Sequence, residues 1–188
     1  AVSSRPTAIA VIGVDEAGEN SIIVASGANL DTAASQVPDA LLGPGVTVLC
    51  QNEIRAAETF AALVRAKRLG ARTVLNMAPA AAVPPEVLGA LDLLVVNEIE
   101  AEAVAGRSGQ PPHELARALA TSYGFTCVVT LGGAGCIAVT AAAAWRVPVL
   151  PISPATPYAV PTLVVHWLQW VFMSNGPALR DVAVHAIC

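Results

Sequence analysis

Short apolar runs alternate with helix-like segments along most of this chain, and this alternation limits the folds open to it. The apolar runs show little polar alternation, which is typical of strands buried on both faces of a parallel sheet. Between them, apolar residues recur at helical spacing. The strand-like runs are 46–50, 72–79, 92–98 and 125–135, and the helix-like segments are 54–69, 84–91, 99–106 and 112–124. This order predicts an α/β fold with a mostly parallel sheet and helices on both of its faces.

A β-hairpin is predicted ahead of this sheet. The stretches AIAVIGV (8–14) and SIIVA (21–25) are rich in β-branched residues, and DEAGEN between them supplies acidic residues, Gly18 and Asn20 for a turn. The chain is therefore expected to divide into a hairpin within residues 1–29, an α/β core over 30–151 and a C-terminal segment of different character over 152–188.

Composition excludes several classes of function. The 188 residues are 55% hydrophobic and 13% charged, with a formal net charge of -4, which suits one compact domain and offers no basic surface for nucleic acid. The apolar run 162–173 is broken by His166 and Gln169 and is shorter than the roughly 20 residues that a membrane span needs. No Cys-x-x-Cys pair occurs, and Cys50 and Cys127 lie inside strand-like runs, so we expect free thiols and a cytoplasmic location.

Polar and small residues close the predicted strands, where parallel sheets bind ligands. Asn76 and Asn97 end two strands, and Thr130, Gly132, Gly133 and Gly135 follow a third. Small residues after a strand let backbone N–H groups approach a phosphate. An ordinary glycine turn between two strands explains the same residues without any ligand.

Asn97 and Glu100 lie three residues apart at a strand-to-helix junction, and two interpretations remain open. In a capping box, Asn97 would begin the helix and Glu100 would bond back to the Asn97 N–H. In a metal site, Glu100 would help to hold a hydrated Mg²⁺, which prefers carboxylate, water and phosphate oxygens. The spacing alone favours the cap.

Five stretches together resemble, in order and approximate spacing, the motifs of the ribokinase family of sugar kinases. They are similar to that family's Gly-Glu-Asn hairpin, Gln-x-Glu strand end, Asn-Pro-Ala-Pro-Ala loop, Asn-x-x-Glu motif and Thr-Leu-Gly-x-x-Gly turn. The stretches are AIAVIGVDEAGENSIIVASGAN, LCQNEI, LNMAPA, DLLVVNEIEAEAVAG and VVTLGGAGCIAV. Met77 stands where the family usually has proline. The resemblance covers Thr7 to about Pro151 and implies a ribokinase-like fold in which the hairpin is a lid.

The resemblance also implies an activity: ATP-dependent phosphorylation of the primary hydroxyl of a sugar, with ribose as the expected substrate. By resemblance, Ala10 would face the sugar and Glu53 would hydrogen-bond a sugar hydroxyl. The implied nucleotide-binding residues are Asn97, Thr130, Gly132 and Gly135. Glu100 would lie close to Mg²⁺ and its waters, and a monovalent cation such as K⁺ is a further expected cofactor. The lid could pair with a second copy to form a homodimer.

The two sugar-side residues also have interpretations that need no ligand. Glu53 could be a solvated acid near the start of a helix, where the helix dipole favours negative charge. Ala10 could simply pack against neighbouring residues as part of a strand.

Two motifs of the family have no match in this sequence. The family begins with a longer N-terminal part, which carries a sugar-binding Asp and a Gly-Gly-Lys-Gly-x-Asn segment. It also carries a Gly-Ala-Gly-Asp anion hole, whose Asp removes the proton from the attacking sugar hydroxyl. Because phosphoryl transfer depends on positioning and charge stabilisation, we expect a truncated chain with impaired activity and no catalytic residue in frame.

The anion-hole motif should fall between Pro154 and about Asn175, where the residue composition changes and two of the three tryptophans occur. Read one base upstream, codons allowed for Pro154 to Thr162 can spell Gly-Asp-Thr, two further residues and Gly-Ala-Asp. Codons for Val165 to Gln169 can spell Gly-Ala-Leu-Ala-Ala. We hypothesise that this segment is frame-shifted; coding DNA without this text in a neighbouring frame would refute the hypothesis. The alternative is a diverged apolar helix over Thr162 to Phe172.

Two other classes of function remain open. A non-catalytic remnant of a sugar kinase would bind nucleotide without turnover, or would act only as an assembly partner. Half of a dinucleotide-binding oxidoreductase is disfavoured, because no Gly-x-Gly-x-x-Gly follows the first strand.

Overall fold

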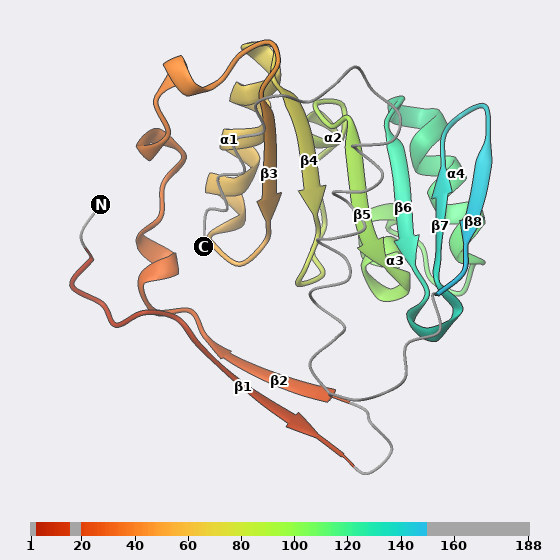
Figure 1. Cartoon of the computed structure of the whole chain (residues 1–188), viewed down its shortest axis with the longest axis horizontal. Helices are drawn as coiled ribbons and strands as arrows, with labels where there is room; N and C mark the ends of the chain where they lie inside the picture. Colours follow the sequence, from red (N-terminus) through yellow and green to blue (C-terminus); the bar gives the residue numbers. More distant parts are fainter. Residues whose placement is uncertain (1–2, 16–19, 150–188) are drawn as a thin grey trace.

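The computed structural model describes residues 3–15 and 20–149, which form a six-stranded sheet and a separate two-stranded hairpin (Figure 1). The strands of the sheet lie in the same order as they occur along the chain, from β3 to β8. β3, β4, β5 and β6 pair in parallel, and β7 and β8 add antiparallel strands at one edge. The hairpin lies beyond the carboxyl ends of the parallel strands (Figure 1).

The elements have the following bounds. The strands are β1 (Ile9–Val14), β2 (Asn20–Ala25), β3 (Thr47–Gln51), β4 (Arg72–Asn76), β5 (Leu93–Asn97), β6 (Thr126–Thr130), β7 (Cys136–Val139) and β8 (Ala144–Val147). The α-helices are α1 (Ala56–Arg68), α2 (Pro85–Leu88), α3 (Glu98–Ala105) and α4 (Pro112–Tyr123). Short 3-10 helices are η1 (Gly27–Asp31), η2 (Ala34–Gln36), η3 (Asp39–Leu41) and η4 (Gly132–Ala134).

The hairpin exposes apolar side chains on both of its faces. Ile12 pairs with Ile22 and Val11 with Ile23, and alternate residues of a strand point to opposite faces. Ala10, Ile12 and Ile22 therefore share one face, and Val11 and Ile23 share the other. The large apolar side chains are between 53% and 71% exposed in Ile9, Val11, Ile12, Val14, Ile22, Ile23 and Val24.

The two ends of the hairpin are held together tightly. A Cβ atom at Gly27 would lie only 2.3 Å from the carbonyl oxygen of Pro6, and the φ of Gly27 is +46°. Glycine is required here on both grounds. Asp31 accepts a hydrogen bond of 2.6 Å from the Ser3 hydroxyl and pairs with the Arg5 guanidinium at 3.2 Å. The base of the hairpin is thus a compact, well-bonded junction.

Residues 32–46 connect the hairpin to the sheet, and α1 holds this connector in place. Arg65 donates through Nη2 to the carbonyl oxygens of Ala34, at 2.8 Å, and of Val37. Glu58 accepts a hydrogen bond of 2.8 Å from the Ala34 N–H. These two charged side chains lie away from the apolar face of α1, yet they bind protein backbone rather than solvent alone.

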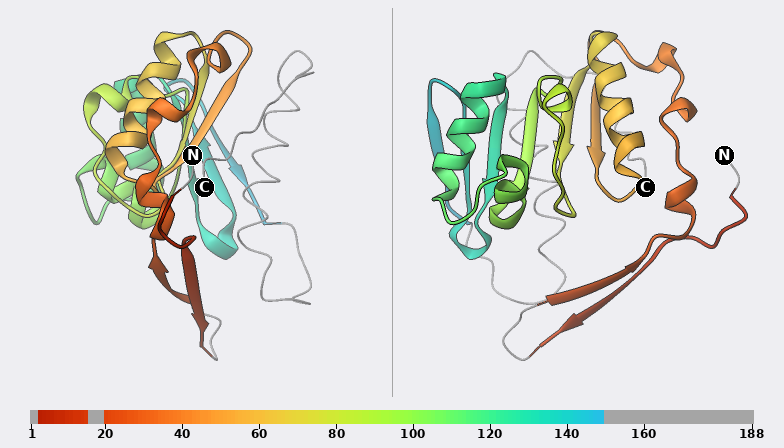
Figure 2. Two further views of the ribbon diagram at one scale, coloured as in Figure 1. Left: turned by 90° about the vertical axis from the view of Figure 1, so that its left-hand side faces the viewer. Right: turned by 180° about the vertical axis from the view of Figure 1, so that it is seen from behind.

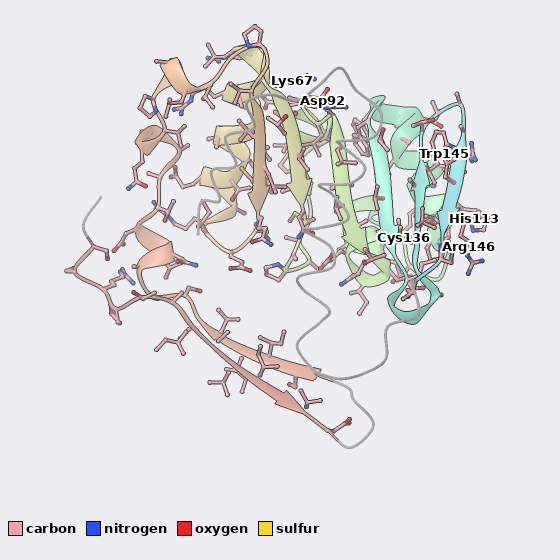
Figure 3. The ribbon with its side chains drawn as sticks, in the orientation of Figure 1. Lys67, Asp92, His113, Cys136, Trp145 and Arg146 are labelled. Atoms are coloured by element: carbon pink, nitrogen blue, oxygen red, sulfur yellow. The ribbon has the colours of Figure 1, made fainter. Side chains whose placement is uncertain are left out.

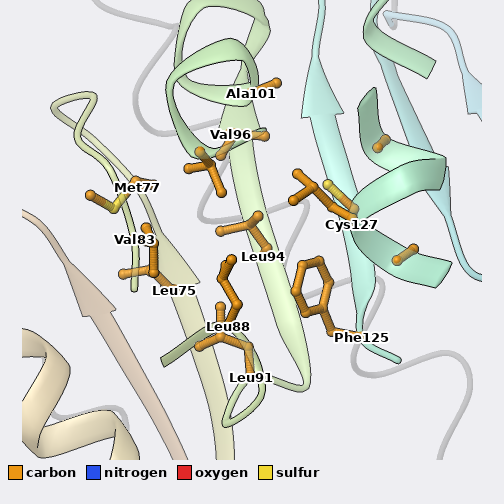
Figure 4. Close-up of a cluster of buried hydrophobic side chains, with 14 of the residues drawn as sticks. Leu75, Met77, Val83, Leu88, Leu91, Leu94, Val96, Ala101, Phe125 and Cys127 are labelled. Atoms are coloured by element: carbon orange, nitrogen blue, oxygen red, sulfur yellow. The ribbon is translucent and has the colours of Figure 1, made fainter. Parts of the chain in front are cut away.

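The described helices all pack on one face of the sheet (Figure 2). Since the strands follow one another across the sheet, each right-handed crossover returns on the same side. The main core lies between these helices and the sheet and includes Leu63, Leu75, Leu94 and Phe125, each 2% exposed or less. Figure 4 shows Leu75, Leu94 and Phe125. Burying a side chain of this size contributes about 1.5–3 kcal/mol, so this layer supplies much of the stability.

A smaller apolar cluster lies on the opposite face of the sheet and is built on strand residues. Its buried members are Val74, Leu93, Val95, Val128 and Cys136. Successive positions of the central strands alternate between the two clusters, as the pleat requires. Both faces of these strands are therefore buried, which explains their continuous apolar sequences.

One ion pair braces the amino-terminal edge of the sheet, opposite the hairpin. Asp92 accepts hydrogen bonds from Lys67 Nζ at 2.6 Å and from the Thr73 N–H at 2.9 Å (Figure 3). The Thr73 hydroxyl, whose shorter hydrogen bond goes to the Ala90 carbonyl, lies 3.1 Å from the same carboxylate. The end of α1 is thereby joined to the starts of β4 and β5.

The mostly parallel sheet and the separate hairpin predicted from sequence are confirmed. β8 was not predicted, because its sequence AWRV lacks an apolar run and its residues are largely exposed. Helices on the second face remain an expectation, and the segment 152–188 lies outside the described residues. Among the helices that the structure describes, none is long and apolar enough to cross a bilayer.

Replacing Asp92 with Asn should lower the free energy of unfolding by about 1–2 kcal/mol at neutral pH, because charged acceptors form the stronger hydrogen bonds. Burial alone would raise the pKa of Asp92, but the bonds from Lys67 and Thr73 outweigh burial and lower it from its ordinary 3.8. The contribution of Asp92 is present above the unfolded-state pKa and is lost as pH falls through the lower folded-state pKa.

Denaturant unfolding from pH 7 to pH 3 measures this effect. The difference between wild type and D92N should be full near pH 7 and should shrink below about pH 4. Glu114→Gln, the same type of change at an exposed site on α4, is the control and should shift stability by less than about 0.5 kcal/mol. A difference that stays constant over this pH range would contradict the brace.

Candidate active site

The parallel register gathers the polar strand ends at the carboxyl edge of the sheet. Gln51 pairs with Asn76, and Asn97 pairs with Thr130. The Thr130 hydroxyl donates to the Val96 carbonyl at 3.4 Å, which links β6 to β5 at this edge. Residues that are far apart in sequence thus form two polar pairs at one edge of the sheet, on the side where the hairpin lies (Figure 1).

The two residues expected to contact a sugar lie in different elements. Glu53 is exposed in the loop between β3 and α1, and Ala10 is exposed on β1. Ala10 belongs to the hairpin, whose strands pair with each other and not with the described sheet. A small pocket opens beside the Glu53 loop, lined by Thr32 from the connector and by Gln51 and other residues at the end of β3 and in α1.

Asn97 and Glu100 form the capping box at the start of α3. Asn97 Oδ1 accepts a hydrogen bond of 2.8 Å from the Glu100 N–H, and Glu100 Oε2 accepts one of 2.7 Å from the Asn97 N–H. The capping interpretation of this spacing is therefore confirmed. It leaves Glu100 Oε1 without a hydrogen-bond partner among the described residues.

Glu100 is a buried carboxylate, with only 8% of the residue exposed. Burial raises the pKa of Glu100 above its ordinary value of 4.5, although the hydrogen bond from the Asn97 N–H opposes this. The start of a helix also favours negative charge, which acts in the same direction as that hydrogen bond. A neutral Gln at this position could complete the same capping box without a buried charge.

The glycine turn between β6 and β7 contains positions of two kinds. A Cβ atom at Gly135 would lie 2.1 Å from the Val147 carbonyl oxygen. The close approach of β8 is therefore sufficient reason for glycine at this position. A Cβ atom at Gly132 or Gly133 would meet nothing within 4 Å. In the described part of the chain, the N–H groups of Gly132 and Gly133 donate to no backbone acceptor. These two amides are thus available to an anion.

No group of three or more His, Cys, Asp or Glu side chains that could hold a metal ion occurs within residues 3–15 and 20–149. A hydrated Mg²⁺ needs fewer protein ligands, because water and phosphate oxygens complete its octahedral shell. The unpartnered Oε1 of Glu100 fits such an ion better than a metal that demands several side chains.

Sequence analysis placed Gly132, Gly133 and Gly135 in this turn, but the resemblance implied a nucleotide-binding role only for Gly132 and Gly135, not for Gly133. The open space around its Cα atom distinguishes it from Gly135, and this signal exists only in three dimensions.

Solved structures share this architecture. Ribokinase from Giardia lamblia is 28% identical, with a TM-score of 0.70 over 82% of this chain and 52% of its own. Arabidopsis thaliana ribokinase, complexed with ribose and ATP, matches 94% of this chain and 59% of its own with a TM-score of 0.68; at 21% identity this likeness shows the fold alone. The fold defines the chain as one of the ribokinase-like α/β proteins.

Sequence comparison narrows the class to a family. Mouse ribokinase is 32% identical over 137 residues, which make up 70% of this chain and 42% of the mouse protein. The pfkB family carbohydrate kinase profile matches residues 1–155, and the chain belongs to this family. The chain spans about half the length, or less, of the relatives that it matches.

Replacing Asn97 with Ala should lower the free energy of unfolding by about 1 kcal/mol, because an N-cap hydrogen bond is lost. Glu100→Gln should have the opposite sign at pH 7, since Gln completes the cap without a buried charge. With its raised pKa, Glu100 contributes stability that is present below the unfolded-state pKa and is lost as pH rises through the folded-state pKa. The advantage of E100Q should therefore vanish below about pH 4.

Denaturant unfolding of both variants between pH 3 and pH 8 tests this. A wild-type chain that is more stable than E100Q at pH 7 would show that the carboxylate itself stabilises the helix start.

Proposed function

We propose that this chain acts in the ATP-dependent phosphorylation of the primary hydroxyl of a sugar, with ribose as the substrate. The observation that carries the proposal is the capped, acidic start of α3 beside a turn with free amides, at the carboxyl edge of the sheet. In a member of the pfkB family this edge faces a hairpin that resembles the family's lid.

The nucleotide half of the site would use backbone more than side chains. The N–H groups of Gly132 and Gly133 would bind phosphate oxygens, with Thr130, Asn97 and Gly135 framing the same edge. Gly135 would contribute by letting β8 approach, which shapes the turn.

Glu100 is the proposed link to Mg²⁺. Since Gln would satisfy the cap, a buried carboxylate that costs stability is better explained by a cation that needs its charge. Bound MgATP would supply the phosphoryl group, with Mg²⁺ neutralising phosphate charge, and Glu100 would hold a water of this ion through Oε1. A monovalent cation such as K⁺ belongs to the same proposal as a further cofactor.

The sugar half would use Glu53 and the hairpin. The exposed Glu53 carboxylate would accept a hydrogen bond from a sugar hydroxyl, and Ala10 would offer a small, uncharged surface over the ring. The described residues assigned here bind and orient the reactants; none of them is assigned the removal of the hydroxyl proton.

A second candidate is a non-catalytic remnant that binds nucleotide. It is favoured by the same observation, because the free amides and Glu100 require no catalytic base. Turnover separates the two: sugar-dependent release of ADP supports the kinase, and ATP binding without turnover supports the remnant.

Gly133→Ala tests the nucleotide site directly. Its methyl group would meet nothing in the folded chain but would block a phosphate, so ATP affinity should fall about tenfold or more while stability is kept. Calorimetry with MgATP measures the affinity. Gly89→Ala, another position with room for a methyl group, lies after α2 and should leave ATP binding unchanged. Equal ATP affinities for wild type and G133A would leave the turn without a phosphate role.

The exposed hairpin supports a further part of the proposal, a homodimer. A two-stranded ribbon is marginally stable in water, and one with apolar side chains on both faces needs cover on both. The face with Ala10, Ile12 and Ile22 is assigned to the sugar site. The face with Val11 and Ile23 would then pack on the same face of a second copy, as a two-fold interface requires.

Neighbouring substitutions on opposite faces separate these two roles. Ile23→Lys should convert dimer to monomer in sedimentation velocity runs, because it places a charge in an apolar interface. Ile22→Lys, one residue away on the other face, should leave the dimer intact and weaken ribose binding. The dimer proposal fails if both variants sediment as wild type does.

A further inference from the structure

Asn52 joins the loop that carries Glu53 to the loop that follows β4. Its backbone N–H donates to the Ala78 carbonyl at 3.0 Å, and its side-chain Nδ2 donates to the Pro79 carbonyl at 3.0 Å. One residue thus binds two consecutive carbonyl groups, 26 and 27 positions further along the chain. This double contact fixes the direction of the backbone at Asn52.

The rest of the loop around Glu53 is anchored by α1, whose Glu58 N–H donates to the Arg55 carbonyl at 2.8 Å. The Thr59 hydroxyl, buried in α1, donates to the Gln51 carbonyl at 3.2 Å. No hydrogen bond or ion pair of the Glu53 side chain is found among the described residues, and the residue is exposed. The position of the Glu53 carboxylate therefore depends on its neighbours in the chain rather than on bonds of its own.

The loop on the other side is well fixed. Met77 is fully buried, and its N–H donates to the Val95 carbonyl at 3.0 Å. The Ala78 N–H donates to the Asn76 carbonyl at 2.9 Å. Asn52 is therefore bonded to a part of the chain that is rigidly joined to the central strand β5.

The Asn52 side chain is retained at a cost. Its Oδ1 atom is buried and has no hydrogen-bond partner in the described part of the chain, which costs about 1–3 kcal/mol for a buried polar group. An apolar side chain would avoid this cost but could not bond the Pro79 carbonyl. The contact with the loop after β4 is thus what this residue type specifically provides.

We propose that Asn52 is the positioning residue for Glu53: it fixes the loop at the end of β3 so that the Glu53 carboxylate meets a sugar hydroxyl. This inference rests on the proposed function, since it assigns Glu53 to the sugar. Asn52 acts through Glu53 and does not touch the substrate.

Asn52→Asp is the informative variant. It keeps the shape of the side chain but sets a carboxylate oxygen against the Pro79 carbonyl, so the bond becomes a repulsion. Gln110→Glu makes the same amide-to-acid change at an exposed site in a loop and is the matched control. We expect N52D to raise the dissociation constant for ribose about tenfold or more, because a small displacement of a positioned group weakens binding strongly. The dissociation constant for ATP should stay unchanged.

A double-mutant cycle with Glu53→Gln separates positioning from a general loss of structure. If Asn52 acts through Glu53, N52D combined with E53Q should bind ribose no more weakly than E53Q alone. Full additivity of the two losses, or ribose binding by N52D equal to that of the control, overturns the proposal.

Hydrogen exchange gives a readout that needs no sugar. In N52D, the amide of residue 52 should exchange faster than in Q110E, because its partner loop is released. A wild-type chain that binds no ribose refutes the sugar role of Glu53 and, with it, the positioning role of Asn52. Unchanged exchange in N52D would refute the joint between the two loops independently of any ligand.

Discussion

The parallel pairing of β3, β4, β5 and β6 determines where the polar groups of the sheet edge lie. Parallel strands place all their carboxyl ends at one edge, and the strand order places every described crossover helix on one face. Asn97 and Thr130 are neighbours only because β5 and β6 share this register. Helix packing on one face and polar strand ends at one edge are thus two results of a single topology.

At that edge, groups that complete the fold also remain open to a ligand. The capping box satisfies the first turn of α3 with one oxygen of Glu100 and leaves the other without a hydrogen-bond partner among the described residues. The turn after β6 uses Gly135 for the approach of β8, while the amides of Gly132 and Gly133 donate to no backbone acceptor in the part of the chain that the structure describes. The structural and the functional interpretations of these motifs are therefore compatible. Each accounts for different atoms of the same residues.

The sequence could predict whatever depends on local pattern. The strand β5 was predictable because both of its faces are buried, and the Asn97–Glu100 cap because its partners are three residues apart. It could not predict the bonds from Asn52 to Pro79 or from Arg65 to Ala34, which join positions 27 and 31 residues apart. Such contacts depend on how loops meet after the sheet has formed. β8 was not predicted for another reason: an exposed edge strand needs no apolar run.

The close packing at the base of the hairpin has a mechanical consequence. Gly27 and Pro6 leave no room for a side chain between them, and the two strands extend from that junction without pairing to the sheet. A strand of six residues is about 20 Å long at roughly 3.3 Å per residue. The hairpin therefore projects from a tightly packed base. A rotation of about ten degrees at this base moves the far end of the hairpin by about 3–4 Å, more than the length of a hydrogen bond. A precisely fixed backbone direction at Gly27 therefore fixes the position of the far end of the hairpin.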